Sequence, residues 1–430
     1  MTAGGEAANG STGLRGGHRV ECGAAPPLRR EPIPAPVLKV AVVHDWLDTW
    51  RGGERVLAEI LRIYPAADLH ALVDFLPDSD RVRLGGRRAS TSFLQRMPFA
   101  RSSFRLWLPL FPRAIEALDV ERYDLVISSS HAVAKGVRTH TRQLHVCYCY
   151  TPMRYAWDLR EQYLRETRLD RGVRGAAVDA MLARLRAWDR ATSERVDAFV
   201  AISEHIAARI RRCYGRDSTV IYPPVTPPAS ERRREDVYVT VSHLVPYKRV
   251  DLLVEAFRRM PSRTLVVIGA GPLRARLAET APPNVRLLGS VADAERDAWL
   301  ARARAFVFAA EEDFGIAPLE AQACGTPVIA YAGGAARETI RDLDDAAPTG
   351  VLFGEQSAEA IVAAIDRFER NEATIAADAC RDNARRFSAE RFRRELAAFV
   401  SERLVQHERM RAQGLLAHEL APTRAVRRET

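Results

Sequence analysis

The stretch FVFAAEEDFGIAPLEAQACGTPVIA, residues 306–330, places a turn and a short helical segment between two apolar runs. Apolar runs on either side of a helix are typical of a strand–helix–strand unit in a parallel sheet. Glu312 lies in the turn, Glu320 lies in the helical segment, and residues 315–317 stand at the helix start. Unpaired N–H groups and a partial charge of about half an elementary charge make a helix start a phosphate site. Carboxylates on both sides of a phosphate predict contacts with hydroxyl groups, and the three features together indicate a nucleotide sugar.

The two glutamates have a second interpretation. A Glu in the first helical turn stabilises the helix dipole without any ligand, and this alternative stays open for Glu312. Pro318 suits a first helical turn, so we expect the preceding turn to be held in place. A fully helical segment would separate the two glutamates by ~12 Å at ~1.5 Å per residue. Acid pairs of glycosidases lie about 5 to 9.5 Å apart, so we expect Glu312 and Glu320 to have separate roles.

Lysine is rare in this chain, and one lysine lies in a second candidate motif. The sequence has 61 arginines and three lysines, and Lys248 precedes a helical segment in VSHLVPYKRVDLLVEAF, residues 241–257. An ammonium group with three donors suits phosphate oxygens, although an ordinary surface lysine is the alternative. His243 and Arg249 flank Lys248 in the same loop.

Two N-terminal motifs have weaker signals. HDWLDTWRGGERVLAEI, residues 44–60, places Gly52 and Gly53 between a strand and a helix, where the missing side chains allow a phosphate to approach the backbone. An ordinary turn is the alternative. SSSHAVAKG, residues 128–136, places His131 just past a strand, and a structural histidine is the alternative there.

Together these motifs resemble the retaining glycosyltransferases of the group 1 (family 4) type, whose two-domain fold is called GT-B. The resemblance covers roughly residues 39–400 and rests on the Glu-x7-Glu motif and on the ACGTPV run at 323–328. In that family the first Glu contacts the transferred sugar, the second contacts the ribose, and the N–H groups between them face the diphosphate. The resemblance implies these roles for Glu312, for Glu320, and for the segment of Phe314, Gly315, Ile316 and Ala317.

The resemblance also implies roles for the other candidates. Gly52 and Gly53 would face the donor phosphates, and His131 would lie beside the transferred sugar. The family usually has Arg where this chain has His243, and that Arg acts with the lysine on the diphosphate. His243 would then donate as an imidazolium or as a neutral N–H, or Arg249 would take over.

One further motif bears on the donor. CYCYTPMRYAWD, residues 147–158, is similar to a subgroup of O-antigen and exopolysaccharide mannosyltransferases, which often has His where Tyr150 stands. GDP-mannose is therefore the first donor to expect, followed by UDP-glucose or another UDP-hexose.

The order of apolar and helical segments predicts an α/β fold with two Rossmann-like, doubly wound domains facing each other. Short apolar runs alternate with helical stretches, and a proline-rich segment at 222–236 suggests a linker. We expect a disordered extension at 1–36, an acceptor domain at 37–225, a nucleotide-sugar domain at 226–390, and a helix and tail at 391–430 that pack back on the first domain. The predicted strands are 37–43, 124–128, 144–149, 198–202, 237–241, 264–268, 285–288 and 305–309, and the predicted helices include 54–63, 250–259, 272–279 and 293–302.

Composition excludes several classes of protein. The net charge of +9 comes without a helix-turn-helix, zinc-finger or RNP-like pattern, so we expect no nucleic-acid binding. The sequence has no uninterrupted run of about 18 apolar residues, so we expect no membrane span. Residues 1–36 lack the apolar core of a secretory signal. Six cysteines without paired metal spacing indicate reduced thiols in a cytoplasmic protein, with Cys147 and Cys149 in a core.

Residues 98–113, PFARSSFRLWLPLFPR, interleave aromatic and basic side chains. One interpretation is a helix with its apolar face in the core. The other is an exposed basic surface, with Phe104, Trp107, Leu108 and Phe111 beside arginines, that binds an anionic membrane or a polyprenyl diphosphate carrier. The second interpretation would place the protein at the inner face of the plasma membrane.

These observations predict a metal-independent, retaining hexosyltransferase without a cofactor, in which Lys248, Glu312 and His131 carry the chemistry. The acceptor would be a glycan or a polyprenyl-diphosphate-linked saccharide of cell-surface polysaccharide synthesis. The alternative is a non-catalytic GT-B subunit that binds a nucleotide sugar or a glycan within an assembly complex. The departures at His243 and Tyr150 keep that alternative open.

Overall fold

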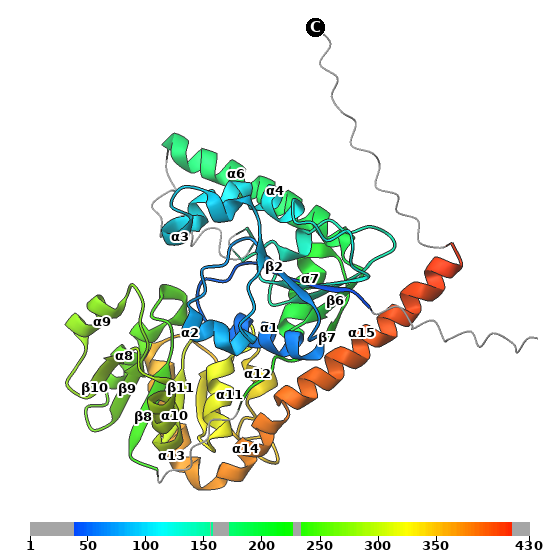
Figure 1. Cartoon of the computed structure of the whole chain (residues 1–430). Helices are drawn as coiled ribbons and strands as arrows, with labels where there is room; N and C mark the ends of the chain where they lie inside the picture. Colours follow the sequence, from blue (N-terminus) through cyan, green and yellow to red (C-terminus); the bar gives the residue numbers. More distant parts are fainter. Residues whose placement is uncertain (1–37, 155, 158–171, 227–233, 415–430) are drawn as a thin grey trace, which may run out of the picture. The chain divides into compact units, whose positions relative to one another are not determined.

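The structure is a computed structural model that describes residues 38–154, 156–157, 172–226 and 234–414. The extension expected at 1–36 with Cys22, residues 227–233 of the proline-rich linker and the end of the C-terminal tail lie outside the described residues. Two parallel β-sheets organise the rest, each covered by helices (Figure 1). We call the part around the first sheet the first domain and the part around the second sheet the second domain.

The first sheet has seven strands in the order β3-β2-β1-β4-β5-β6-β7, and every neighbouring pair is parallel. Its central strands are apolar and fully buried, as expected for a parallel sheet with helices on both faces. The strands are β1 Val40–His44, β2 Asp68–Ala71, β3 Ser90–Thr91, β4 Leu125–Ser130, β5 Leu144–Cys149, β6 Ala198–Ala201 and β7 Ser218–Val220. The helices are α1 Gly52–Ile63, α2 Asp78–Arg81, α3 Ala100–Ser103, α4 Phe111–Glu116, α6 Gly172–Thr192 and α7 Glu204–Tyr214.

The second sheet has six parallel strands in the order β10-β9-β8-β11-β12-β13. The strands are β8 Val237–Val241, β9 Thr264–Ile268, β10 Val285–Gly289, β11 Ala305–Phe308, β12 Val328–Tyr331 and β13 Gly350–Phe353. The helices are α8 Val250–Arg258, α9 Arg274–Thr280, α10 Asp293–Arg302, α11 Ile316–Ala323, α12 Ala336–Thr339, α13 Ala358–Asn371, α14 Ala377–Arg385 and α15 Ala389–Ala412. Both domains are Rossmann-like, and the strand order reverses between β1 and β4 and between β8 and β11. In such sheets ligands bind beyond the carboxyl ends of the strands at the reversal.

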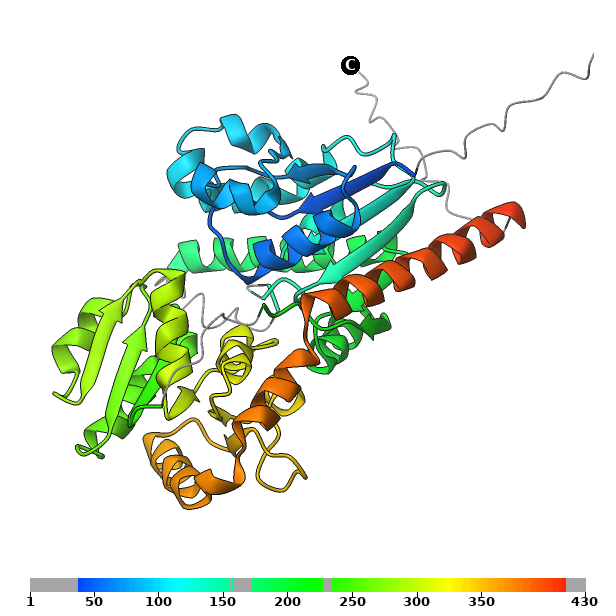
Figure 2. The ribbon, with the colours of Figure 1, turned by 60° about the horizontal axis from the view of Figure 1, so that its bottom comes forward.

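The C-terminal helix α15 follows the second domain in the sequence but packs against the core of the first domain. Helix α15, the long orange-to-red helix in Figure 2, contacts α1 and β5. Four of its apolar side chains join the buried cluster of the first sheet: Phe392, Leu396, Phe399 and Val400. None of the helices in the described part of the chain is long and apolar enough to cross a membrane.

The chain passes between the domains at two adjacent places. The backbone N–H of Val225 donates to the carbonyl oxygen of Phe387 over 2.8 Å, next to a parallel bridge between Val225 and Ser388. Tyr222 stacks on Phe314 at 5.9 Å between ring centroids, and Phe387 contacts both rings edge-on. The aromatic ring of Phe314 therefore ties the loop before α11 to both crossings.

Residues 98–113 form short helical pieces instead of one amphipathic helix: α3, the 3-10 segment η3 Phe104–Leu110, and α4. Phe104 and Phe111 are buried in the core of the first domain, with Trp107 and Leu108 packed against them. Of the two interpretations of this segment, the packing of the apolar side chains in the core agrees with the structure, and the exposed surface of these four side chains does not. The exposed apolar residues of the segment are Phe99 and Leu106, at 76% and 73% exposure.

Candidate active site

One cavity of about 600 Å³ gathers most of the predicted site residues. The first domain contributes the loop before α1 and Tyr150, and the second domain contributes the loops after β8 and β11. The predicted residues on its wall are Gly52, Gly53, His243, Lys248, Glu312, Phe314, Gly315, Ile316 and Ala317. Glu320, Arg249 and His131 are not on this wall.

Lys248 ends the 3-10 segment η6 Pro246–Lys248 and forms an ion pair with Glu312. Burial and then the guanidinium of Arg154 lower the pKa of Lys248 to about 7. The negative charge of Asp313 opposes this shift, because it favours the charged ammonium. Binding of a further anion, such as a phosphate, would raise the pKa of Lys248 and favour its protonated form.

Arg249 does not accompany Lys248. Its backbone adopts a left-handed conformation (φ 52°) at the N-cap of α8, and its side chain lines a different cavity, with Nε 3.5 Å from Oδ1 of Asp251. The left-handed turn directs two consecutive basic side chains into two cavities. The expectation that Arg249 replaces the family's arginine at the diphosphate is therefore corrected.

His243 lines the first cavity near two basic side chains. Partial burial, and then the charges of Arg51 and Lys248, lower the pKa of His243. The imidazole is therefore neutral at pH 7, and it offers a phosphate one N–H instead of a positive charge. Of the two forms considered from the sequence, the geometry favours the neutral donor.

The loop before α11 is held by two glycines. Gly315 has φ +87°, a conformation that a residue with a side chain rarely adopts, and it forms the N-cap of α11. The backbone of Glu312 bridges to Gly334, and the carbonyl oxygen of Glu312 accepts a hydrogen bond from the N–H of Ala335 over 2.9 Å. A Cβ on Gly334 would lie 2.1 Å from that oxygen. Glu312 therefore has a fixed backbone, and its side chain is 22% exposed toward the cavity.

Gly52 and Gly53, which the sequence analysis placed in a loop, form the first turn of α1 and lie directly opposite the start of α11. A Cβ on Gly52 would lie 2.7 Å from Cδ1 of Ile316, whereas a Cβ on Gly53 would meet His44 and Tyr150 at ordinary distances of 3.7 and 3.9 Å. The hydroxyl of Tyr150 donates to the carbonyl oxygen of Gly53 over 3.0 Å. Tyr150, which stands where the similar subgroup often has His, thus holds the first turn of α1 in place.

His131 lies near the cavity and is oriented by Asp45. The centroids of the His131 and Tyr150 rings are 6.3 Å apart, and the His131 side chain is 32% exposed. Its Nδ1 lies 2.9 Å from Oδ2 of Asp45, so Nε2 is left for a substrate. Burial lowers the pKa of His131, but the charge of Asp45 and its hydrogen bond outweigh burial, so the pKa is raised overall.

Asp45 is a site residue that the sequence analysis missed. This fully buried carboxylate accepts hydrogen bonds from four consecutive backbone N–H groups, those of residues 131–134, over 2.6 to 3.1 Å. Burial raises the pKa of Asp45, but His131, His44 and the backbone donors outweigh it and lower the pKa to about 2. Its position directly after β1 was the available signal.

Glu320 is buried in α11, and Arg55 of α1 forms an ion pair with its Oε1. Arg55 and Asp313 were also missed. Asp313 lines the cavity and pairs with Arg154 and Arg209 of the first domain over 2.9 and 2.8 Å. Among the described residues, no group of three or more His, Cys, Asp or Glu side chains is placed to hold a metal ion. Metal independence stays a prediction.

Family comparisons agree with this architecture. Residues 50–227 match the model described as Glycosyltransferase Family 4, and residues 227–387 match the model described as Glycosyl transferases group 1. The two adjoining models span more than half of the chain. The chain belongs to this glycosyltransferase family. The match extends to the GT-B fold, because this glycosyltransferase resembles the sucrose-phosphate synthase of Thermosynechococcus elongatus with a TM-score of 0.65 at 18% identity, over 86% of this chain and 100% of that chain.

Curated relatives of this glycosyltransferase include mannosyltransferases. A phosphatidyl-myo-inositol mannosyltransferase of Propionibacterium freudenreichii is 33% identical over 32% of this chain and 38% of its own length. A GDP-mannose-dependent monoacylated alpha-(1-6)-phosphatidylinositol monomannoside mannosyltransferase of Corynebacterium glutamicum is 30% identical over 37% of this chain and 51% of its own length. The chain thus spans about half or less of the length of these two relatives.

Proposed function

We propose that this glycosyltransferase transfers mannose from GDP-mannose to a hydroxyl group of a saccharide acceptor, with retention of the anomeric configuration. The observation that carries the proposal is the common cavity of Lys248, Glu312, the start of α11 and the Gly52–Gly53 turn. Cations and backbone N–H groups on opposite walls suit a diphosphate. The names of the two mannosyltransferase relatives support mannose as the sugar.

The reaction breaks the bond between the anomeric carbon and the β-phosphate oxygen, and forms a bond between that carbon and the acceptor oxygen. The acceptor proton moves to the departing phosphate oxygen, so no protein base is required. Negative charge grows on the leaving diphosphate. Lys248, the N–H groups at the start of α11 and the Gly52–Gly53 backbone stabilise this charge, which lowers the barrier more than it strengthens donor binding.

The carboxylates and His131 act on the sugar ends of the donor. Glu312 orients the mannose and stabilises positive charge at its anomeric carbon, while Nε2 of His131 contacts a mannose hydroxyl. Glu320 accepts hydrogen bonds from the ribose, and this contact requires Arg55 to leave its ion pair with Glu320. His243 contributes a neutral N–H to the diphosphate. These cations and backbone dipoles replace a metal ion, so we expect activity to persist in EDTA.

The proposal includes contact with an anionic membrane through residues 93–113. This segment has four arginines and no acidic residue, and it exposes Phe99 and Leu106. Each basic side chain near an anionic leaflet contributes about 1 kcal/mol. Flotation with phosphatidylserine vesicles at low salt measures the contact, with phosphatidylcholine vesicles and a Phe99→Ser/Leu106→Ser variant as controls. Failure to float with either lipid removes this part of the proposal.

Radiolabelled donors test the activity. Purified protein is incubated with GDP-mannose, UDP-glucose or UDP-galactose and a lipid-linked saccharide acceptor, with and without EDTA. We expect product with GDP-mannose, an α-linkage by NMR, and product formation about 100-fold slower with Glu312→Gln. Product from a UDP-hexose and not from GDP-mannose would show that the proposed donor is wrong. Saturable GDP-mannose binding without turnover of any acceptor would instead identify a non-catalytic binding subunit.

A further inference from the structure

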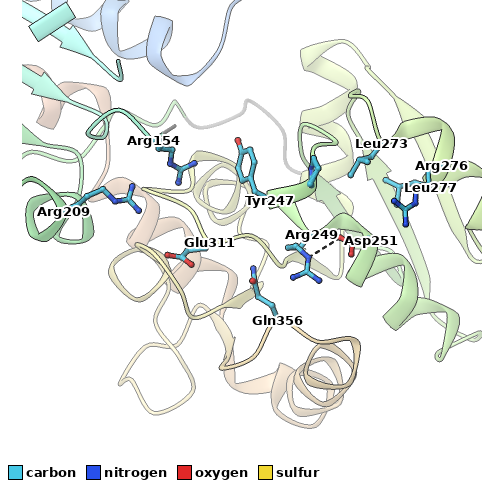
Figure 3. Close-up of a pocket in the computed structure, with 11 residues that line it drawn as sticks. Arg154, Arg209, Tyr247, Arg249, Asp251, Leu273, Arg276, Leu277, Glu311 and Gln356 are labelled. Atoms are coloured by element: carbon cyan, nitrogen blue, oxygen red, sulfur yellow. Dashed lines mark ion pairs between the residues drawn. The ribbon is translucent and has the colours of Figure 1, made fainter. Parts of the chain in front are cut away.

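A second cavity of about 610 Å³ lies beside the first, and Tyr247 lines both (Figure 3). Arg154 and Arg209 of the first domain line one side, and Arg249, Arg276 and Gln356 of the second domain line the other. The family roles assigned above do not involve Arg154, Arg209 or Arg276, and Arg249 lies outside the donor cavity. The cavity therefore has no assigned ligand.

The lining of this cavity is rich in guanidinium groups. Four arginines face two carboxylates, those of Asp251 and Glu311. Asp251 pairs with Arg249, whereas Glu311 is exposed. Because guanidinium groups bind carboxylates and phosphates through two parallel hydrogen bonds, the excess of arginine suits an anionic ligand.

Two of these arginines are held in place by the fold. Arg209 is 6% exposed, and its Nη1 donates to Thr151 over 3.0 Å and to Asp313 over 2.8 Å. Arg249 lines the cavity with a left-handed backbone (φ 52°), a conformation that is rare in a residue with a side chain. Hydrogen bonds to distant residues therefore fix Arg209, and the left-handed backbone sets the direction of the Arg249 side chain.

The position of the cavity relates it to the transfer reaction. Glu311 and Glu312 are consecutive, and so are Lys248 and Arg249, but each pair divides between the two cavities. Asp313, which lines the donor cavity, accepts hydrogen bonds from Arg154 and Arg209 of the second cavity. A molecule in the second cavity, which Glu311 lines, would therefore lie next to Glu312, the residue that we place at the transferred sugar.

We propose that this second cavity binds the acceptor through an anionic group, a phosphate or a carboxylate, so that the acceptor is an anionic saccharide. The inference rests on the proposed function, because it places the acceptor beside the donor. The anionic group binds Arg249 and Arg276 and competes with Asp313 for Arg154. Tyr247 and the aliphatic side chains of Leu273 and Leu277 pack against the sugar.

Calorimetric titration of the GDP-saturated full-length protein tests the inference, because GDP keeps added phosphate out of the donor cavity. The probes are mannose 6-phosphate, glucuronic acid and neutral mannose. We expect at least one anionic sugar to bind at least tenfold more tightly than mannose. The stronger of the two identifies the anionic group as phosphate or carboxylate. Equal binding of all three sugars, or binding of none, would overturn the inference.

Variants locate the binding. Arg276→Ala and Arg249→Gln should each weaken binding of the anionic sugar about tenfold or more, with unchanged melting temperature and GDP affinity. Arg274→Ala removes an arginine from the same helix outside the cavity and should change nothing. Unchanged anionic-sugar binding in both cavity variants would place the site elsewhere. Loss of GDP binding by the wild-type protein would instead count against the proposed function, so the two failures are distinct.

Discussion

The lowered pKa of Lys248 makes a quantitative prediction about GDP binding. With a pKa of about 7 instead of the ordinary value of 10.5, about nine tenths of the free protein carries neutral Lys248 at pH 8. A diphosphate in the cavity favours the ammonium, so binding raises this pKa. Lys248 should therefore take up most of a proton for each GDP bound at pH 8.

The sign of the pH dependence follows from this uptake. Protonation of Lys248 and GDP binding favour each other, so GDP affinity falls as the pH rises above 7. Below about pH 6 the terminal phosphate of GDP takes up a proton itself, so the affinity is highest near pH 7. The Kd should increase about tenfold per pH unit between pH 7.5 and the pKa of the bound form. Calorimetry in two buffers with different ionisation enthalpies measures the proton number directly.

A charge-preserving variant provides the control. Arginine stays protonated throughout this range, so Lys248→Arg should bind GDP with almost no proton uptake and a flat pH profile. His243→Asn removes the neighbouring titratable group and should keep the uptake of the wild-type protein. Uptake below about 0.2 proton by the wild-type protein at pH 8, or equal uptake by Lys248→Arg, would refute the reasoning.

Three further variants test the site. Glu312→Gln should lower kcat about 100-fold while the Kd for GDP changes less than threefold, and a kcat within fivefold of wild type would remove Glu312 from the chemistry. Gly53→Ala has room in the fold, so the melting temperature should hold while the donor KM rises about tenfold; an unchanged KM would mean that no phosphate approaches this turn. Asp45→Asn should lower the free energy of unfolding at pH 7 by about 2 kcal/mol, from the shift of its pKa to about 2. This stabilisation is present above about pH 4 and is lost as the pH falls to 2, and equal stability of wild type and variant in urea titrations at pH 7 would contradict it.

Most strands of the second domain followed from the sequence, because β8, β9 and β11 are short apolar runs with almost every residue buried. The predicted runs at 237–241 and 264–268 coincide with β8 and β9, and the predicted helix at 293–302 coincides with α10. The glycosyltransferase family and the GT-B fold predicted from the motifs are confirmed. Short strands such as β3 and β7 carry two or three residues and leave no comparable pattern.

The site could be predicted only where neighbours in sequence form it. The strand–turn–helix unit places Glu312 and Gly315 together by itself. Asp45 binds a loop 86 residues away, so its role depends on the pairing of β1 with β4. The left-handed backbone of Arg249 is invisible in a sequence pattern, and it decides which cavity the side chain enters. In residues 98–113, Pro109 and consecutive apolar residues broke the helical period that would have revealed which side chains are buried.

The paired crossings at Val225 and Phe387 have a mechanical consequence. Two adjacent covalent links restrict the relative motion of the domains mainly to rotation about a line through them. Displacement in a rotation grows with distance from its axis, so Phe314 and the adjoining start of α11 would shift little while remote parts of the gap between the sheets swing further. The start of α11, where we propose that the diphosphate binds, would thus keep its position while the two domains open and close. Substrates would enter and leave on the side of the gap that lies furthest from the crossings.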